Sequence, residues 1–125
     1  MQVRIFIVED NPLILEWLTQ ALHDLTLAQV VGSAATENQA CDWLLTHHAG
    51  WDLAVIDIGL AQGNGVNVVK RLRSRCVAQR MVVLSNYTAT HVRNACMTAG
   101  ADAFFDKSTQ IEEFAQYVND GSFCN

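Results

Sequence analysis

Five short apolar runs alternate with amphipathic stretches along the chain, and each run has the length of a buried strand. The runs span residues 3–8, 28–33, 53–56, 81–84 and 103–105. Between them, apolar residues recur at the three- and four-residue spacing of a helix. Strands that alternate with helices form a parallel sheet with both faces buried. The pattern therefore predicts an α/β fold built from five strand–helix units.

Signals for the first two helices follow the first two predicted strands. Asn11 is a favourable helix cap and Pro12 suits the first helical position, which predicts a helix directly after the first strand. Its apolar residues at helical spacing are Leu13, Ile14, Trp17, Leu18, Ala21, Leu22 and Leu25. Residues 36–39, Thr-Glu-Asn-Gln, match a capping box and predict a second helix that ends near residues 49–50.

The second half of the chain predicts three more helices. A glycine-rich turn at residues 59–64 comes before the third helix, and the fourth stops at Gly100, a typical position for a left-handed cap. Residues 109–112 match another capping box before the fifth helix, which ends around residues 119–121. The apolar positions are Val66, Val69 and Leu72 in the third helix, Val92, Ala95, Cys96 and Ala99 in the fourth, and Ile111, Phe114, Ala115 and Val118 in the fifth.

Composition and charge favour one folded domain over residues 1–125. Half of the residues are apolar and 17% are charged, as in a compact globular protein. The net charge of -5 and the pI near 5.1 argue against direct nucleic-acid binding, which needs clustered positive charge. No apolar run of about 18 residues is present, so we expect no membrane segment and a cytoplasmic location.

The four cysteines give no sign of a metal or redox site. Cys41, Cys76, Cys96 and Cys124 form no CxxC pair and have no histidine at metal-ligand spacing. We therefore expect reduced, structural thiols, with only Cys124 exposed. The two histidines at residues 47–48 stand at a predicted helix end, where positive charge suits the helix dipole.

The polar residues that follow the predicted strands carry the candidate chemistry. Glu9 and Asp10 follow the first strand, Asp57 the third, Ser85 the fourth and Lys107 the fifth. In open parallel sheets, ligands bind at the carboxyl ends of the strands, where the strand order reverses. With the order 2-1-3-4-5, strands one and three flank that point, so the three carboxylates should converge there. Such a group attracts a hard divalent cation with a preference for oxygen ligands.

We expect this cation to be Mg²⁺ or Mn²⁺. Asp57 and Asp10 would supply oxygen ligands, and Glu9 would contribute through water. The neutralised Asp57 could then approach a phosphorus atom that is surrounded by negative oxygens. Lys107 would offer a point charge to Asp57 and to the phosphoryl oxygens, and the Ser85 hydroxyl would donate a hydrogen bond to one of them.

In order and spacing these residues resemble the receiver domain of two-component response regulators, and the resemblance extends from residues 8–11 to the last helix. It implies a flavodoxin-like fold, a five-stranded parallel sheet in the order 2-1-3-4-5 with five helices on its two faces. Asp57 matches the family's phosphoacceptor, and Gly59 matches a position whose backbone carbonyl binds the metal. Phe104 matches an aromatic switch residue, three positions before the lysine, that swings inward when the phosphoryl group pulls Ser85.

The resemblance implies a signalling phosphoacceptor rather than an enzyme with a separate substrate. A sensor histidine kinase or a phosphotransfer protein would supply the phosphoryl group. Its added charge would change the surface around the fourth helix, fifth strand and fifth helix, which would contact an output domain, a downstream protein or a second copy of the chain. The sequence ends at Asn125 without an output domain, which fits a single-domain regulator or a piece of a longer protein.

Several positions depart from the family pattern. Ser108 stands where the family usually has Pro after a cis bond, and because a cis bond before Ser costs about 3 to 4 kcal/mol, we expect a trans bond. Ala61 also replaces a common Pro, which predicts a more mobile turn. Asp106 replaces an apolar residue, and the sequence offers no explanation for it.

Two further positions bear on the lifetime of a phosphorylated state. Gly59 and Tyr87 lie two residues beyond Asp57 and Ser85, where side chains screen the acyl phosphate from water. A small residue opens the site and a bulky one closes it, so we predict no extreme lifetime.

Other functions on the same fold stay open. A flavodoxin-like electron carrier needs a phosphate-binding loop rich in Ser, Thr and Gly, whereas residues 8–12 would repel phosphate. An aspartate-based phosphatase needs a second Asp where Gly59 stands, and a pseudo-receiver would lack one of the site residues. Taken singly, Ser85 also suits a cap of the next helix and Phe104 a static place in the core. Only their joint occurrence favours a phosphoryl-transfer site.

Overall fold

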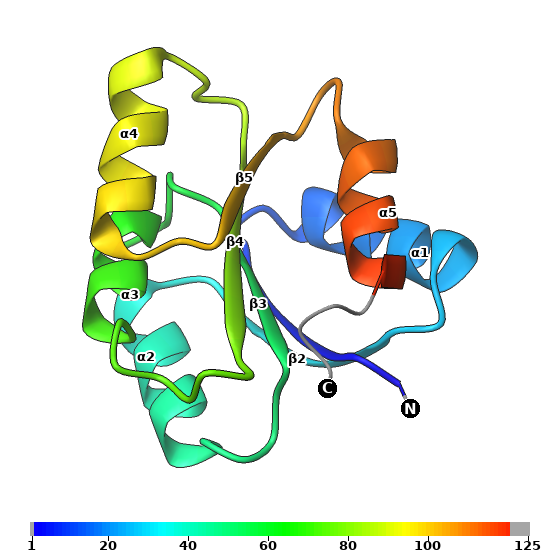
Figure 1. Ribbon diagram of the computed structural model, residues 1–125, viewed down its shortest axis with the longest axis horizontal. Coiled ribbons are helices and arrows are strands. Elements are labelled where there is room, and N and C mark those ends of the chain that lie inside the picture. The colour runs from blue at the N-terminus through cyan, green and yellow to red at the C-terminus, as the bar shows by residue number, and fades with distance from the viewer. Residues whose placement is uncertain (1, 121–125) are drawn as a thin grey trace.

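The computed structural model describes residues 2–120, in which strands and helices alternate along the chain (Figure 1). The strands are β1 (Arg4–Val8), β2 (Gln29–Ala34), β3 (Leu53–Ile56), β4 (Arg80–Ser85) and β5 (Ala103–Asp106). The helices are α1 (Pro12–Leu25), α2 (Glu37–Thr46), α3 (Gly65–Arg71), α4 (Thr90–Ala99) and α5 (Ile111–Asp120). None of these helices has the length and apolar content that crossing a lipid bilayer requires.

All five strands are parallel and lie in the order β2-β1-β3-β4-β5, as the sequence predicted. The central strands are nearly continuous apolar runs because helices cover both faces of the sheet. Val8 is level with Ile56, Ile56 with Val83, and Ser85 with Asp106. This register places the polar residues that follow the strands at the same end of the sheet, where the strands have their carboxyl ends.

Two hydrophobic clusters cover the two faces of the sheet. Neighbouring strand residues such as Phe6 and Ile7 point to opposite faces, so each strand contributes to both clusters. One face carries α2, α3 and α4, through Ala40, Cys41, Leu44, Val68, Val69, Cys96 and Ala99. The other face carries α1 and α5, through Leu18, Leu22, Phe114 and Val118. Figure 1 shows this arrangement, with α1 and α5 together on one side of the sheet.

Several helix ends follow the sequence signals. The side chain of Asn11 accepts two backbone N–H groups from the first turn of α1. Gly100 ends α4 with a φ of +123°, a conformation that glycine adopts at little cost. Thr36 accepts the Gln39 N–H at 3.2 Å, but the Gln39 side chain accepts from Ala35 instead of Thr36. The first capping box is therefore only half formed.

Two predicted helix boundaries were wrong. α2 ends at Thr46, before residues 49–50, because a turn closed by the Gly50 N–H and the His47 carbonyl follows it. α5 begins at Ile111, so its cap position falls on Gln110 and the second capping box is out of register. The Gln110 side chain accepts the Asp106 N–H at 2.8 Å and so belongs to the preceding turn.

Exposure also differs from expectation at two places. Leu13 and Trp17 of the predicted apolar stripe on α1 are 75% and 47% exposed, because Leu18 and Leu22 are the α1 residues fully buried against the sheet. Cys76 is exposed, contrary to the expectation that only Cys124 would be. Cys124 itself lies outside the described residues.

Candidate functional site

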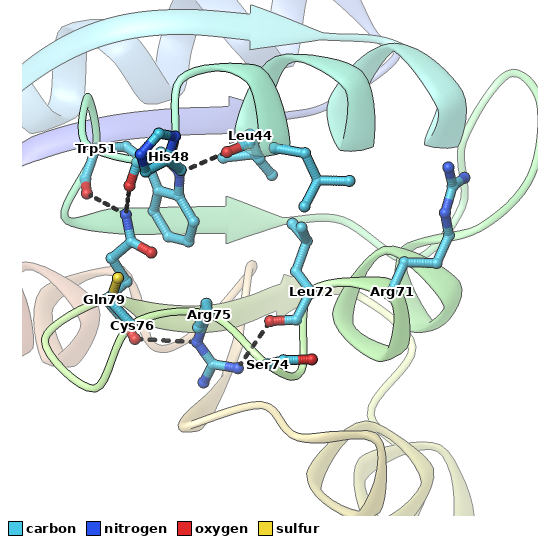
Figure 2. Close-up of a pocket in the computed structure, with 10 residues that line it drawn as sticks. Leu44, His48, Trp51, Arg71, Leu72, Ser74, Arg75, Cys76 and Gln79 are labelled. Carbon is cyan, nitrogen blue, oxygen red and sulfur yellow. Dashed lines mark hydrogen bonds between the residues drawn. The ribbon is translucent and has the colours of Figure 1, made fainter.

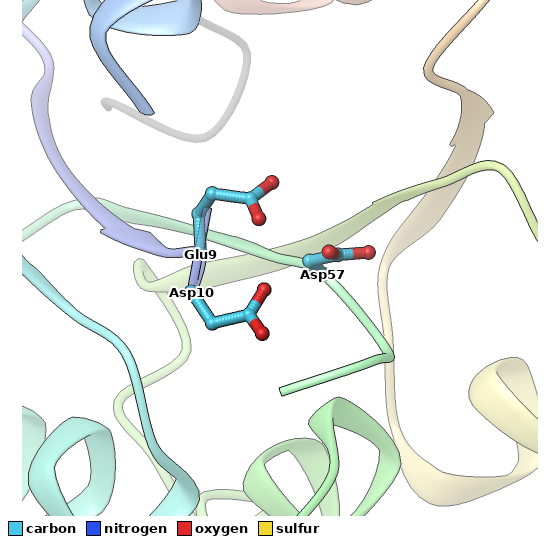
Figure 3. A group of neighbouring side chains, drawn as sticks. All are labelled: Glu9, Asp10 and Asp57. Atoms are coloured by element: carbon cyan, nitrogen blue, oxygen red, sulfur yellow. The ribbon is translucent and has the colours of Figure 1, made fainter. Parts of the chain in front are cut away.

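A crevice of about 490 Å³ opens at the carboxyl ends of the central strands. Its lining residues are Glu9, Asp10, Asn11, Ile14, Asp57, Gly59, Leu60, Asn86, Tyr87 and Lys107. Carboxylate oxygens of Glu9, Asp10 and Asp57 all lie within 4.8 Å of one another. Figure 3 shows the side chains of Glu9 and Asp10 directed toward the side on which Asp57 lies. The predicted convergence of the three acids is therefore present.

Glu9 is the buried member of this group, with 4% of its surface exposed. Its Oε1 lies 2.7 Å from Nζ of Lys107, and its Oε2 accepts the Asn11 N–H at 3.1 Å. Both carboxylate oxygens thus have partners, as a buried charge requires. Sequence reasoning placed Lys107 beside Asp57 and missed that Glu9 is its nearer partner.

Asp57 lies directly after β3 with its two oxygens in different surroundings. Oδ1 accepts the Ile58 N–H at 2.9 Å, and Oδ2 lies 3.2 Å from Nζ of Lys107. Burial raises the pKa of Asp57 above its ordinary value; Lys107 opposes this shift and Glu9 adds to it. The carboxylate is thus held in place but carries a charge that the site does not fully compensate.

The start of α3 fixes the backbone of Asp57. A Cβ on Gly65 would overlap the Asp57 carbonyl oxygen, so only glycine allows the helix to approach this closely. The Asp57 N–H is held by the Val8 carbonyl at 2.9 Å. Gly65 was not recognised as a site residue from sequence, because a glycine at a helix start has many ordinary explanations.

Asp10 differs from the other two acids because its side chain is exposed and has no hydrogen-bond or ion-pair partner among residues 2–120. Its oxygens are free to bind a ligand. Three carboxylates beside one ammonium leave the crevice with net negative charge. These donors fit a hard divalent cation, which prefers carboxylate oxygens.

Ser85 is fully buried at the end of β4, and its Oγ accepts the Tyr87 N–H at 2.9 Å. It does not cap the next helix: α4 starts at Thr90 after Ala89, with no side-chain cap. The alternative explanation of Ser85 as a helix cap is therefore wrong. Ser85 donates no hydrogen bond within residues 2–120, but it has no exposed surface and is not among the residues that line the crevice.

Phe104 is buried in β5, with 7% of its surface exposed, and packs in the cluster beneath α4. The guanidinium carbon of Arg93 lies 4.6 Å from the centre of the Phe104 ring. This is the geometry of a cation–π contact, which connects α4 to the predicted switch residue. No sequence signal indicated the contact, because it depends on the side-chain rotamers of both residues.

The turn after β5 accommodates the departures from the family pattern. No cis peptide bond occurs among the described residues, so the expected trans bond before Ser108 is confirmed. Ser108 Oγ donates to Asn86 Oδ1 at 2.7 Å and thereby connects this turn to the one after β4. Asp106 Oδ1 accepts the Ser108 N–H at 2.7 Å, which gives Asp106 a role in closing the turn.

The turn that lacks Pro after β3 is bound to α2. Glu37 Oε1 accepts the Asn64 N–H at 3.2 Å, and the Glu37 N–H donates to the Gln62 carbonyl at 3.0 Å. Beside the crevice, Tyr87 covers Gly59: a Cβ on Gly59 would lie 3.4 Å from Cε2 of the ring. The mobility of this turn stays a prediction.

Comparisons with known sequences agree on one family. The sequence profile described as "Response regulator receiver domain" matches residues 5–119. The transcriptional regulatory protein PhoP of Escherichia coli is 31% identical over 111 residues, which cover 89% of this chain and 48% of PhoP. The DNA-binding transcriptional activator DevR/DosR of Mycobacterium tuberculosis is 30% identical over 118 residues, which cover 94% of this chain and 54% of that protein. The chain thus spans about half the length of the curated relatives it matches.

Solved structures agree on the fold. The receiver domain of the response regulator NarL from Mycobacterium tuberculosis has a TM-score of 0.82 and 25% identity, and the match covers 94% of this chain and 93% of that one. The CheX-CheY complex with BeF3 and magnesium from Borrelia burgdorferi gives a TM-score of 0.83 at 20% identity, with 93% and 86% covered. The CheY-like fold predicted from the sequence is therefore confirmed.

Proposed function

This chain belongs to the response regulator receiver domain family, and on that premise we propose that Asp57 is its phosphoacceptor. A receiver domain is a signalling phosphoacceptor rather than an enzyme in the usual sense. One observation carries the assignment of Asp57: its carboxylate reaches the crevice between the unpartnered Asp10 and the ammonium of Lys107. Glu9 is less suited because its side chain is only 2% exposed, against 15% for that of Asp57.

The proposed reaction transfers a phosphoryl group from a histidine imidazole to Asp57. A carboxylate oxygen forms the new P–O bond while the P–N bond to the imidazole breaks, and the imidazole leaves with the bonding electron pair. Lys107 lies close enough to balance charge on the phosphoryl oxygens, and Glu9 holds Lys107 in position. Ser85 donates its free O–H to one phosphoryl oxygen.

We assign a divalent cation, Mg²⁺ or Mn²⁺, to the acidic crevice. Asp10 and Asp57 would bind it directly, the backbone carbonyl of Gly59 would add a ligand, and Glu9 would contribute through water. When bound, the ion would neutralise the acids and attract the phosphoryl oxygens. The magnesium named in the solved Borrelia burgdorferi complex supports this assignment.

The phosphoryl donor would be a sensor histidine kinase or a phosphotransfer protein in the cytoplasm. Leu13 and Trp17 are exposed one turn apart on α1, and Ile14 of the same helix lines the crevice. An apolar surface beside the site suits a partner that must bring its imidazole to Asp57. We expect this domain itself to make no direct contact with nucleic acid.

Phosphorylation would change the surface formed by α4, β5 and α5, for an output domain, a downstream protein or a second copy of the chain. The curated relatives are named as transcriptional regulators and are about twice as long as the matched region, which supports an output domain as the target. Phe104 is already buried in this structure. We therefore expect phosphorylation to change how Phe104 packs against α4, through its contact with Arg93. We do not expect the Phe104 ring to swing inward from solvent.

Incubation with magnesium and a small-molecule phosphodonor tests the proposal. Intact mass should increase by one phosphoryl group in the natural protein and not in Asp57→Asn, and chelation of the metal should prevent the increase. Self-association is measured on the same samples. Equal labelling of the Asp57→Asn variant would exclude Asp57 as the acceptor.

A further inference from the structure

A second pocket lies between the end of α2 and the segment that connects α3 to β4 (Figure 2). Its volume is about 200 Å³. Trp51 and Gln79, which line it, lie two residues before β3 and one residue before β4, the strands that end beside Asp57 and at Ser85. Strands of this length extend about 13 to 20 Å. The pocket is therefore at the opposite end of the sheet from the phosphoacceptor crevice.

Three buried apolar residues form a fixed part of the pocket wall. Leu44, Trp51 and Leu72 line it, and each is at most 3% exposed, so they belong to the core as well. The Trp51 indole N–H donates to the Leu44 carbonyl at 3.1 Å, which sets the orientation of the ring. The exposed Cys76 is also part of the lining. An indole and a sulfur atom favour contact with an aromatic ring over an aliphatic chain.

Arg75 holds the segment that forms one side of the pocket. Its Nε donates to the Gln79 carbonyl at 3.0 Å, and one terminal nitrogen donates to both the Gly100 carbonyl and the Asp102 carboxylate. These contacts join the segment to the neighbouring strand end. The pocket is consequently formed before any ligand arrives.

One polar atom inside the pocket lacks a partner. Gln79 is only 8% exposed, and its Nε2 donates to the carbonyls of His48 at 2.6 Å and Trp51 at 3.0 Å. These two bonds fix which end of the amide carries the oxygen. Oε1 accepts no hydrogen bond from residues 2–120, and Figure 2 shows it directed away from those carbonyls. Among residues 2–120, Arg80 Nε is the one fully buried side-chain nitrogen or oxygen without a partner, so Gln79 Oε1 is accessible and can accept from a ligand that brings a donor.

We propose that this pocket binds a small, uncharged aromatic molecule with one hydroxyl group, a phenol. An apolar cavity of about 150 Å³ can hold one benzene ring, so the volume suits a single substituted ring. The hydroxyl would donate to Gln79 Oε1 while the ring contacts Trp51 and Leu72. Arg71 and Arg75 at the pocket disfavour a cationic ligand.

An NMR titration of the ¹⁵N-labelled chain with phenol, anisole and toluene tests this inference. Phenol should give saturable shifts at the amides of Trp51, Cys76 and Gln79 and at the Trp51 indole N–H. Anisole and toluene lack the donor and should bind at least about fivefold more weakly. Equal affinities for phenol and anisole, or no saturable shift in this region, would overturn the proposal.

Alkylation of Cys76 supplies an independent test that leaves the core intact. In a Cys124→Ser background, Cys76 is the exposed thiol, because Cys41 and Cys96 are buried. Phenol at about three times its Kd should slow alkylation about fourfold, because only about a quarter of the pockets are then empty. Once Cys76 carries N-ethylmaleimide, the phenol-induced NMR shifts should disappear. Shifts that persist in the alkylated protein would place the ligand elsewhere and refute the site.

Phenol binding in this pocket does not depend on Asp57, so the Asp57→Asn variant should bind phenol equally well.

Discussion

Lys107 forms a closer ion pair with Glu9, at 2.7 Å, than with Asp57, at 3.2 Å. The side chains of Lys107 and Glu9 are 8% and 2% exposed. A pair this deeply buried needs both members, because the loss of either leaves a charge without compensation. Glu9 therefore has a positioning role that precedes any role in metal binding: it holds the ammonium beside the phosphoacceptor.

Removal of the ammonium should destabilise the fold as well as the site. In Lys107→Met, Glu9 is left buried and unpaired beside Asp57, and we expect the free energy of unfolding to fall by about 3 to 5 kcal/mol. Phosphorylation of Asp57 should also slow strongly. Urea denaturation and the rate of labelling by a small phosphodonor measure the two effects.

A double variant separates these two roles of Lys107. Adding Glu9→Gln to Lys107→Met removes the unpaired charge, so most of the lost stability should return while labelling stays slow. If Lys107→Met alone were as stable as the natural protein, the buried pair would contribute nothing to stability.

Asp57→Asn should stabilise the protein when no metal is bound. Burial raises the pKa of Asp57, so the folded state holds its proton to a higher pH than the unfolded chain does. The free energy of unfolding therefore falls as the pH rises from the ordinary pKa of an aspartate to the raised pKa of folded Asp57. Above that pH the loss persists. Thermal unfolding in chelator should show the variant melting a few degrees higher at pH 7, with a smaller difference at low pH. Added magnesium should raise the Tm of the natural protein more than that of the variant.

Ser85→Ala should separate phosphorylation from signalling. The variant leaves the Tyr87 N–H without its acceptor, at a cost of about 1 to 3 kcal/mol, and removes the hydroxyl that would bind a phosphoryl oxygen. We expect labelling of Asp57 to continue while the accompanying change in hydrogen exchange at α4 and β5 is lost. Ser85→Thr keeps the hydroxyl and should retain the response. Complete loss of labelling in the alanine variant with normal folding would show that transfer requires this hydroxyl.

Arg93 should affect the switch without affecting the acceptor. Arg93→Gln removes the cation above Phe104, which we expect to cost about 0.5 to 1 kcal/mol of stability and to loosen the ring against α4. Labelling of Asp57 should be unchanged, whereas the phosphorylation dependence of partner binding should be reduced. Arg93→Lys keeps the charge, so its phosphorylation dependence of partner binding should lie between those of the natural protein and Arg93→Gln. Phe104→Ala with unaltered partner binding would refute a switch at this position.

Tyr87 should slow hydrolysis of the phosphorylated state. Its ring covers Gly59 at the edge of the crevice, so Tyr87→Ala should admit water and shorten the phosphoryl half-life. Loss of the phosphoryl mass after the donor is removed gives the rate. We expect no extreme lifetime for the natural protein, and a half-life of days would contradict this.

Periodicity and strand endings were sufficient to predict the sheet and the position of the crevice. Each central strand is apolar on both faces and ends at a polar residue, so the order of strands brings Glu9, Asp10 and Asp57 together. Contacts that depend on rotamers were not predictable in this way. Lys107 has two acidic partners within reach, and only the folded side-chain positions show that Glu9 is nearer.

Helix ends and exposure were predicted less well, for a related reason. Gln110 rather than Thr109 occupies the cap of α5 because its side chain takes part in the turn formed by Asp106. Leu13 and Trp17 repeat at helical spacing, yet remain exposed, because α1 presents only part of its apolar stripe to the sheet. Local patterns specify which elements form, whereas tertiary packing decides which side chains are covered.

Locating the phosphoryl group on the chain tests directly whether Asp57 is the acceptor. The protein is labelled with a small phosphodonor in magnesium, and the modified residue is located by fragment mass spectrometry after acyl phosphate trapping. We expect modification of Asp57 alone, rising with magnesium concentration and absent in chelator. Modification of Asp10 or Glu9, or labelling of Asp57 that is independent of the metal, would contradict this expectation.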